Sequence, residues 1–573
     1  MTDVSVTQLA ARSVSFDGPE ARARLRARYR SEGRFRAYGA FALTLTAIFV
    51  LSVLVDITLK GIPAFTQHSL VLDVPITAEL VDPKGTGDPE VIRGGNFFGL
   101  ARDALRSAFP GVSSRLERKK LDGLLSSGAA NSLRDLVVAD PSLVGQTVKT
   151  RLLLSDDADL FLKGNETRVI YTGSRGIATP TGTTGPIKIF TSANDFADDL
   201  QVVKQALAGR LEGLRTRLRR AERGGVEQDI QDLKAEIADI ERRVGQPALA
   251  ENLNDKLPSV LVALNGGLVK LNKIDNTSAE GTVVIPLTSA ADAPAGSWQV
   301  VSYETPESSR KISDLEIAFL ERLKAEGKIE NHFNSIFFTS GDSREAEQAG
   351  ILGSLIGSIL MLSVTIAICV PLGVLAAVYL EEFAPKNWLT DIIEINVNNL
   401  AAVPSIVFGL LGLAVFLNFF GLPRSAPLVG GLVLALLVLP TIIIAARAAL
   451  KAVPPSIKEA ALGVGASHQQ AVFHHVLPLA MPGIMTGTII GMAHALGETA
   501  PLLMIGMLAF VVDIPTGFTD SATALPAQIY IWSDLPEQAF QARTAAAIMV
   551  LLAVLFVMNG LAIWLRKKFE RRW

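Results

Sequence analysis

The sequence predicts an all-α polytopic membrane protein that carries an inserted α+β domain. Two observations lead to this fold class. Only 19% of the 573 residues are charged, which is below the roughly 25% that is usual for soluble domains. The apolar residues are also segregated, because they form long runs within 37–59 and 350–566, whereas the chain between these regions is polar and mixed.

Six apolar runs are long enough to be membrane spans, since a helix needs about 20 predominantly apolar residues to cross a bilayer. They cover 37–59, 350–380, 395–420, 427–449, 479–512 and 543–566. The second and fifth runs are long enough to tilt or to be interrupted. The first run is predicted to be an uncleaved anchor, because segment 1–36 is too long for the leader of a signal peptide and no small-residue cleavage site follows.

Basic residues at both ends of the chain set the expected orientation. Segment 1–36 is rich in arginine and the tail 567–573 is basic, and such residues favour the cytoplasmic side and lipid headgroups. Six spans place both termini on one side, which is therefore predicted to be cytoplasmic, so that residues 60–349 lie outside. The formal net charge of −2 gives no case for a nucleic-acid partner.

Residues 60–349 are expected to fold as the α+β domain. Short β-rich runs such as 168–172 and 282–287 alternate with turns rich in Gly, Pro, Ser and Thr. A helical hairpin is predicted over about 196–245, because apolar residues recur at steps of four and three on both sides of Gly224-Gly225. The hairpin either packs on itself as an antiparallel coiled coil or serves as a docking arm for an extracytoplasmic partner. The domain contains no recognisable catalytic constellation.

The segment 454–478, between the fourth and fifth runs, is too polar to span a membrane. Two prolines end the preceding helix, and Ser456 with Glu459 has the spacing of a capping box that would start a new one. Gly463 and Gly465 permit a bend, because glycine accepts backbone angles that other residues resist. A second short helix then ends at Pro478. The segment is thus predicted to form two short helices along the membrane, joined by a sharp bend.

The same segment resembles the EAA loop of ABC-importer permeases. The residues that carry this resemblance are Glu459, Ala460, Ala461, Gly465, Leu477 and Pro478. His475 departs from the pattern, which usually has an Ile-like residue there. In that family the loop forms the coupling helix that docks into a cleft of a separate ATPase subunit, and a rigid bent pair of helices could carry closure of the ATPase to the spans.

The chain has no phosphate-binding loop of the G-x-x-x-x-G-K-[ST] type. The resemblance therefore implies a transport subunit that is not an enzyme, has no catalytic residues and no cofactor, and relies on ATP hydrolysis by a partner. His468, His474 and His475 do not predict a metal site, because no cysteine or suitably placed acidic residues accompany them.

The wider resemblance covers about 345–566 and includes 353–385, 399–412 and 483–503. These segments look like the phosphate-importer permease subunit of the PstA type, in an extended variant with a large outside domain. The resemblance implies the type I ABC-importer fold in a bacterial inner membrane. It also implies a second permease subunit, two copies of an ATP-binding subunit and an extracytoplasmic phosphate-binding protein as partners.

Four polar residues are candidates for the substrate path: Arg447, His494, Glu498 and Thr499. A charged side chain within a span is costly and is usually kept for a use. Arg447 could equally be a cytoplasmic anchor, and His494 could simply pair with Glu498 one helical turn later. Many members of the family have an arginine at the position of His494, and a protonated histidine paired to Glu498 could supply the same attraction to an oxyanion.

Other functions remain open at this point. The EAA loop would suit a permease for another oxyanion or a phosphonate equally well, and only the segment Gly497–Leu503 and the second run favour phosphate. A membrane-anchored sensor or scaffold would need neither the polar 494–499 patch nor the loop. A secondary transporter is a poor match to a loop that docks an ATPase.

Overall fold

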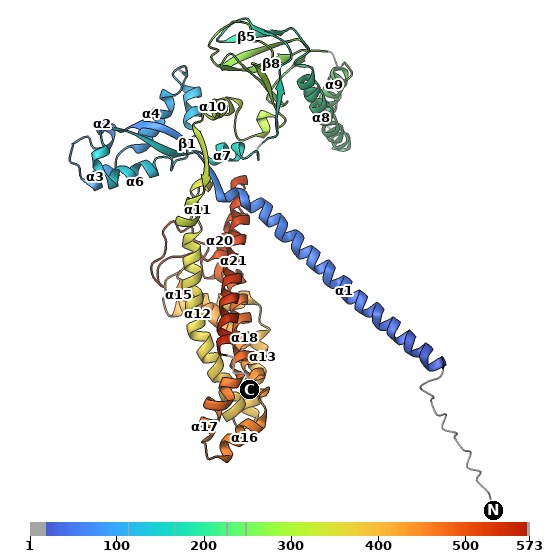
Figure 1. Ribbon diagram of the computed structural model, residues 1–573, viewed down its shortest axis with the longest axis vertical. Helices are drawn as coiled ribbons and strands as arrows, with labels where there is room; N and C mark the ends of the chain where they lie inside the picture. Colours follow the sequence, from blue (N-terminus) through green and yellow to red (C-terminus); the bar gives the residue numbers. More distant parts are fainter. Residues whose placement is uncertain (1–18, 113, 166, 225–226, 247–248, 570–573) are drawn as a thin grey trace, which may run out of the picture.

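The computed structural model describes residues 19–112, 114–165, 167–224, 227–246 and 249–569. A bundle of long helices forms one part, and the inserted domain sits at one end of this bundle (Figure 1). The outer parts of the two basic ends (1–18 and 570–573) and the turn of the predicted hairpin (225–226) lie outside the described residues.

The bundle is built from helices that are long and apolar enough to cross a membrane. Five such helices are found among the described residues, or up to six when a bent pair counts as one span. The helices outside the inserted domain are α1 (Pro19–Gly61), α12 (Leu352–Val378), α13 (Trp388–Ala401), α14 (Ser405–Gly412), α15 (Pro427–Lys451), α16 (Pro455–Gly463), α17 (His468–Ala471), α18 (Leu477–Gly497), α19 (Ala500–Met504), α20 (Leu525–Ser533) and α21 (Gln538–Phe569). Three wide π-type turns extend them: η5 (Tyr379–Phe383), η6 (Leu413–Phe419) and η7 (Val472–Val476).

Helix α15 is the central helix of the bundle. It packs against α12 on one side and α18 on the other, and 61% of its most apolar window is buried, more than for the other candidate spans. Helix α1 behaves differently, because it leans away from the bundle (Figure 1) and its apolar window is 0% buried. It touches α21 near Gly61, where an added Cβ would meet the Sδ of Met549 at 2.7 Å.

The third apolar run is not one continuous span, so the prediction over 395–420 is wrong in this respect. Helices α13 and α14 with η6 meet at an angle of 101°. The cause is Pro404, which has no N–H to donate and disfavours helical backbone angles at the residue before it. The chain therefore leaves one helix after Ala401 and enters the next at Ser405.

The inserted domain contains two antiparallel sheets. One has three strands in the order β11-β1-β2, and the other has eight, in the order β3-β10-β7-β8-β9-β5-β4 with β6 paired to β8. The strands are β1 (Thr66–Pro75), β2 (Thr147–Leu153), β3 (Val169–Gly173), β4 (Ala178–Pro180), β5 (Pro186–Thr191), β6 (Glu251–Asn252), β7 (Ser259–Leu264), β8 (Gly267–Ile274), β9 (Ser278–Ile285), β10 (Gln299–Tyr303) and β11 (Ile329–Phe333).

Helices cover these sheets and complete two apolar cores, of which the first joins the three-stranded sheet to one part of the eight-stranded sheet and the second lies with the rest of the eight-stranded sheet. They are α2 (Ala78–Val81), α3 (Pro89–Arg93), α4 (Phe97–Ser107), α5 (Arg115–Asp122), α6 (Asn131–Ala139), α7 (Asp156–Leu162), α8 (Ala197–Gly224), α9 (Glu227–Val244), α10 (Asp314–Ala325) and α11 (Ser335–Thr339). Four short 3-10 turns complete the domain: η1 (Ile62–Phe65), η2 (Pro141–Leu143), η3 (Glu307–Ser309) and η4 (Ala346–Gln348).

The domain closes where its first and last strands meet. β1 follows α1 and η1 directly, β11 precedes α11 and the start of α12, and the two strands pair antiparallel with Thr66 opposite Phe333. The chain thus enters and leaves the domain at one place. This arrangement lets about 270 residues fold between α1 and α12 without separating the spans that flank them.

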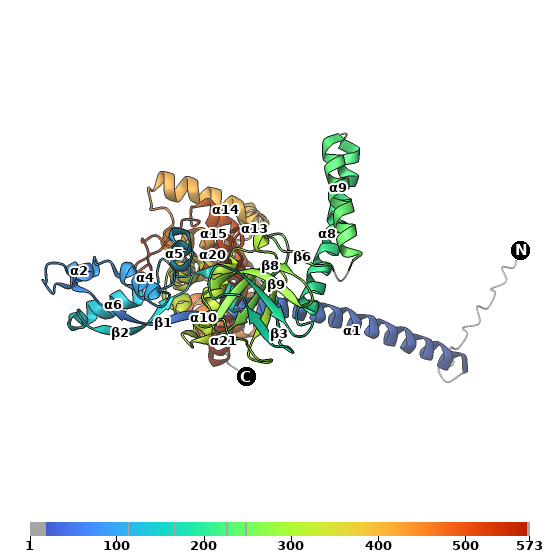
Figure 2. The ribbon, with the colours of Figure 1, turned by 90° about the horizontal axis from the view of Figure 1, so that it is seen from above.

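The predicted hairpin is a pair of antiparallel helices, α8 and α9, which project sideways from the eight-stranded sheet (Figure 2). Leu207, Leu211 and Leu214 of α8 are buried together with Ile237 and Ile240 of α9. Ion pairs flank this apolar seam, with Arg210 Nη2 at 2.5 Å from Glu236 Oε1 and Arg215 Nη2 at 2.7 Å from Glu241 Oε1.

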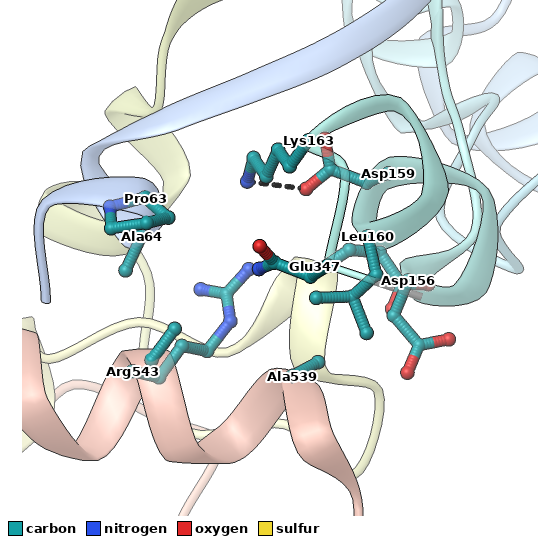
Figure 3. A pocket seen from close by; sticks show the side chains of 11 residues that line it. Pro63, Ala64, Asp156, Asp159, Leu160, Lys163, Glu347, Ala539 and Arg543 are labelled. Carbon is teal, nitrogen blue, oxygen red and sulfur yellow. Dashed lines mark hydrogen bonds and ion pairs between the residues drawn. The ribbon is translucent and has the colours of Figure 1, made fainter. Parts of the chain in front are cut away.

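A cluster of buried charges joins the domain to the bundle, and we call it the polar joint: Asp159, Lys163, Glu347 and Arg543. Figure 3 shows these side chains around a cavity of about 20 Å³, which has room for about one water. Lys163 Nζ lies 2.6 Å from Asp159 Oδ2, and Arg543 Nη1 donates to the carbonyl of Ala349 at 2.6 Å. The joint ties α7 of the domain to the top of α21.

Glu347 is the member of the polar joint whose charge is least stabilised by hydrogen bonds. Its side chain is 3% exposed, Ser126 Oγ donates to its Oε1, and its Oε2 has no hydrogen-bond partner among the described residues. Burial raises the pKa of Glu347 to about 7, and the hydrogen bond from Ser126 offsets this only in part. The pKa of the neighbouring Asp159 is shifted in the opposite direction. Burial alone would raise it, but the contacts with His68 and Lys163 outweigh burial and lower the pKa.

Candidate coupling loop and substrate path

The loop 454–478 begins with helix α16, which starts two residues earlier than predicted. Pro454 is its N-cap and Pro455 its first residue, and no side chain caps it. The predicted capping box of Ser456 and Glu459 is therefore absent. A proline suits the first helical position, since its fixed φ is already helical and its missing N–H would have had no partner there. Glu459 is left exposed on the outer surface of α16, next to the exposed Ala460, whereas Ala461 is buried.

The sharp bend after α16 is present and is formed by Gly465. This residue has φ +92°, a left-handed angle that favours glycine. Its N–H donates to Leu462 O at 3.0 Å, and the next N–H, of Ala466, donates to Ala461 O at 3.1 Å. These two bonds form a Schellman motif, which satisfies the last carbonyls of the helix. A capping box of Ser467 and Gln470 then starts α17.

The second arm of the loop is not a separate helix that ends at Pro478, as was predicted. Helix continues without a break from His468 through η7 into α18, and ends only at Gly497. The five-residue turn η7 precedes Leu477 and Pro478. Such a wide turn relaxes the i→i−4 bonding that a proline would otherwise break. The second arm of the loop is thus the first part of the fifth span itself.

Three glycines that sequence analysis did not single out fix the position of α18. Gly483, Gly487 and Gly491 face α15, where a Cβ added to them would meet Ala449 Cβ at 2.6 Å, Ala445 Cβ at 2.2 Å and Val438 Cγ1 at 2.6 Å. Small residues at every fourth position let two helix backbones approach closely. Their regular spacing in the sequence is the signal that could have revealed them.

The fifth span breaks at the residues proposed for the substrate path. Helix α18 ends at Gly497, Glu498 has the extended angles φ −77° and ψ 127°, and α19 begins at Ala500. Pro501 accounts for the break, because its ring would clash with the carbonyl four residues earlier, that of Gly497, if the helix continued. The polar residues therefore lie at a break and not inside a continuous span over 479–512.

The structure brings three of the four candidate path residues together. His494 Nε2 lies 2.7 Å from Glu498 Oε1 across the end of α18, and Thr499 follows as the N-cap of α19. The side chain of His494 is 57% exposed and that of Glu498 is 19% exposed. The histidine thus presents an open polar edge beside a carboxylate.

Arg447 is separate from these residues. It lies two residues before Ala449, which meets Gly483, so that about ten residues of α18, or roughly 15 Å, separate its level from that of His494. Its side chain is 13% exposed and forms ion pairs with Glu394 and with Glu381, the latter at 3.5 Å. The partners of Arg447 are thus carboxylates of α13 and η5.

The described residues contain no group of three or more His, Cys, Asp or Glu side chains that could hold a metal ion. The three histidines of the loop differ in their surroundings. His468 is half-buried, whereas His474 and His475 are exposed.

Two parts of the chain match known families. Residues 369–571 match the family described as "Binding-protein-dependent transport system inner membrane component". Residues 22–171, which include most of α1 and the first part of the inserted domain, match a domain of unknown function, DUF3333. The first match contains the loop and all four candidate path residues.

Two similar proteins are themselves described as permeases. "Phosphate transport system permease protein PstA 1" of Mycobacterium tuberculosis (strain CDC 1551 / Oshkosh) is 32% identical over 223 residues, which are 39% of this chain and 72% of that protein. "Probable ABC transporter permease protein YqgI" of Bacillus subtilis (strain 168) is 37% identical over 168 residues, 29% of this chain and 56% of that protein.

Among solved structures, an inward-facing MetNI methionine ABC transporter is 18% identical and covers 39% of this chain and 95% of its own, with a TM-score of 0.29 that is too low to carry an argument. The identity and coverage of the PstA 1 relative show the family directly. This chain therefore belongs to the PstA-type family of ABC-importer permeases, and it is a membrane-embedded transport subunit, not an enzyme.

Proposed function

We propose that this chain moves inorganic phosphate into the cytoplasm as one permease subunit of an ATP-driven importer. Its partners are a second permease subunit, two copies of an ATP-binding subunit and an extracytoplasmic phosphate-binding protein. The names of relatives in the PstA family support phosphate as the substrate. The names of these relatives favour phosphate over the alternative of another oxyanion or a phosphonate.

One observation carries the coupling part of this proposal: a continuous helix joins the loop to the polar break. The helix from His468 to Gly497 has 30 residues and is therefore roughly 45 Å long. A movement of Glu459, Ala460, Ala461 and the bend at Gly465 would pass through Leu477 and Pro478 to His494, Glu498 and Thr499 as a rigid-body shift. The exposed Glu459 and Ala460 are the part of the loop that an ATPase subunit would contact.

The arrangement of the ends supports an inner-membrane topology with both termini in the cytoplasm. The loop lies at the end of the bundle opposite the inserted domain, and the start of α1 and the end of α21 point toward the loop end (Figure 1). Basic residues, which favour the cytoplasmic side, also lie toward the loop end, since Arg566, Lys567 and Lys568 form the last turn of α21. The inserted domain is then extracytoplasmic.

The function is tested by reconstituting the purified complex, with its own ATPase and binding protein, in proteoliposomes. Uptake of labelled phosphate should require ATP, should be competed by arsenate and should be absent without the ATPase subunit. Uptake of sulfate or molybdate in place of phosphate, without competition by arsenate, would show that the substrate assignment is wrong.

A further inference from the structure

The lower end of α12 carries two adjacent carboxylates, Glu381 and Glu382. Both lie in the wide turn η5, which closes when the N–H of Ala384 donates to Tyr379 O at 2.8 Å. Their side chains are only 18% and 9% exposed, although the sequence around them turns polar. Neighbouring elements therefore cover both charges.

The two carboxylates point to different neighbours. Glu381 Oε2 lies 3.5 Å from Arg447 Nε and 3.5 Å from Lys451 Nζ, both on α15. Glu382 Oε2 instead lies 2.5 Å from Lys458 Nζ, on α16. Glu381 thus connects the end of α12 to the end of α15, and Glu382 connects it to the loop.

Glu382 also contacts the second arm of the loop through its backbone. Its carbonyl oxygen lies 2.8 Å from His468 Nε2, and since a carbonyl can only accept, the Nε2 of this histidine must carry the hydrogen. The ring of the next residue, Phe383, meets the imidazole edge-on, with centroids 4.9 Å apart. Residues on both sides of the bend at Gly465 are therefore attached to one turn of the chain.

We propose that Glu382 is a positioning residue that fastens the coupling loop to the end of α12. This inference rests on the proposed function of the loop and deepens it. Lys458 immediately precedes Glu459, so the ion pair fixes the turn of α16 that presents Glu459 to the ATPase. A displaced loop then moves two spans together: α18, through continuous helix, and α12, through Glu382.

Partial burial strengthens the ion pair between Glu382 and Lys458. The side chain of Lys458 is 30% exposed and that of Glu382 is 9% exposed, so salt and water screen the pair less than they screen an ion pair on an open surface. A hydrogen bond between two charged groups is also stronger than one between neutral groups.

The test measures phosphate transported per ATP hydrolysed in the reconstituted complex. Glu382→Gln keeps the size of the side chain and the backbone bond to His468 but removes the ion pair. We expect this ratio to fall about tenfold in Glu382→Gln and in Lys458→Met, and to fall no further in the double variant, because both changes remove one contact. The ATPase should still co-purify, since Glu459 is unchanged. Asp391→Asn, at an exposed carboxylate at the start of α13, is the matched control and should keep the ratio.

Hydrogen exchange gives a second measurement that needs no transport. The amides of 456–466 should exchange faster in Glu382→Gln than in the wild type. The proposal is overturned if the variant keeps both the transport ratio and the exchange rates, if the two single losses add up in the double variant, or if the ATPase no longer co-purifies. A wild-type complex that moves no phosphate would instead reject the proposed function, and the exchange rates would then decide this inference alone.

Discussion

The imidazole Nε2 of His494 lies 2.7 Å from Oε1 of Glu498, across the end of α18. The contact holds a histidine that is 57% exposed beside a carboxylate that is 19% exposed, at the point where the fifth span breaks. A pair inside a continuous helix would mainly brace that helix. A pair at a break, next to the extended backbone of Glu498, has the arrangement with which broken helices line the sites of other transporters.

The first prediction concerns His494. Replacement by Gln should raise the KM for phosphate uptake about tenfold with a smaller effect on the maximal rate, because it removes the imidazole whose Nε2 lies beside Glu498 on the proposed path. Replacement by Arg should keep uptake, since a guanidinium supplies both charge and donors. The measurement is initial uptake as a function of phosphate concentration.

The control for this prediction is His475→Ile, which changes another exposed histidine to the type of residue usual in the EAA pattern and should leave the KM unchanged. If His494→Gln keeps the wild-type KM and only lowers the thermal stability, then the pair with Glu498 serves to hold the helix end, and the path assignment is wrong.

The second prediction concerns Glu459, which is exposed on α16. Glu459→Lys should release the ATPase subunit during purification, because it reverses a charge on the surface proposed to dock it, while the spans remain inserted. Asp391→Lys makes the same reversal at another exposed carboxylate, at the start of α13, and should keep the ATPase. Equal recovery of the ATPase with both variants would speak against the coupling role of the loop.

The features that sequence analysis predicted well are those set by neighbouring residues. The apolar runs 350–380 and 427–449 correspond to α12 and α15, because the length of an apolar run alone decides whether it can span a membrane. The bend at Gly465 was also predictable, because it depends on a single glycine, which has φ +92°. Pro404 and Pro501 were local signals of the same kind, and both helix breaks could have been predicted from them.

The contacts that sequence analysis missed join residues far apart in the chain. Glu382 and Lys458 are 76 positions apart, and Arg447 and Glu394 are 53 apart. No periodicity or spacing connects such residues, because the packing of whole helices decides which charges meet. The ion pairs of Arg447 could not be predicted for the same reason, since its carboxylate partners lie on two other elements.

The third prediction concerns the glycines between α15 and α18. In Gly487→Ala the new Cβ would meet Ala445 Cβ at 2.2 Å, so the helices must separate, at a cost of about 1–3 kcal/mol for overpacking. We expect a lower melting temperature of the purified protein, and recovery in the double variant Gly487→Ala/Ala445→Gly, which removes the opposing methyl group. Gly497→Ala is the control, since nothing lies within 4 Å of its added Cβ. Equal melting temperatures for Gly487→Ala and the wild type would contradict the close contact.

The fourth prediction concerns the polar joint and pH. The pKa of Glu347 is raised from 4.5 to about 7 by burial, to which the nearby Asp156 and Glu345 add. Between these two values the folded protein holds a proton that the unfolded chain has lost, so the free energy of unfolding falls as the pH rises from about 4.5 to about 7 and then levels off. The full effect is about 3 kcal/mol. Glu347 shares its cavity with Asp159, Lys163 and Arg543, so the loss should loosen the attachment of the inserted domain to α21.

Glu347→Gln tests this directly, because a neutral amide can still accept the hydrogen bond from Ser126 without ever ionising. The melting temperature of this variant should match the wild type near pH 5 and exceed it near pH 8. Glu345→Gln changes an exposed carboxylate two residues away whose charge contributes least to the raised pKa of Glu347, so its melting temperature should stay much closer to that of the wild type at both pH values. A wild-type melting temperature that rises between pH 5 and pH 7, with the same rise in Glu347→Gln, would show that other groups govern the joint. The sign of the difference between the two glutamine variants at pH 8 therefore decides whether a neutral Glu347 stabilises the contact between domain and span.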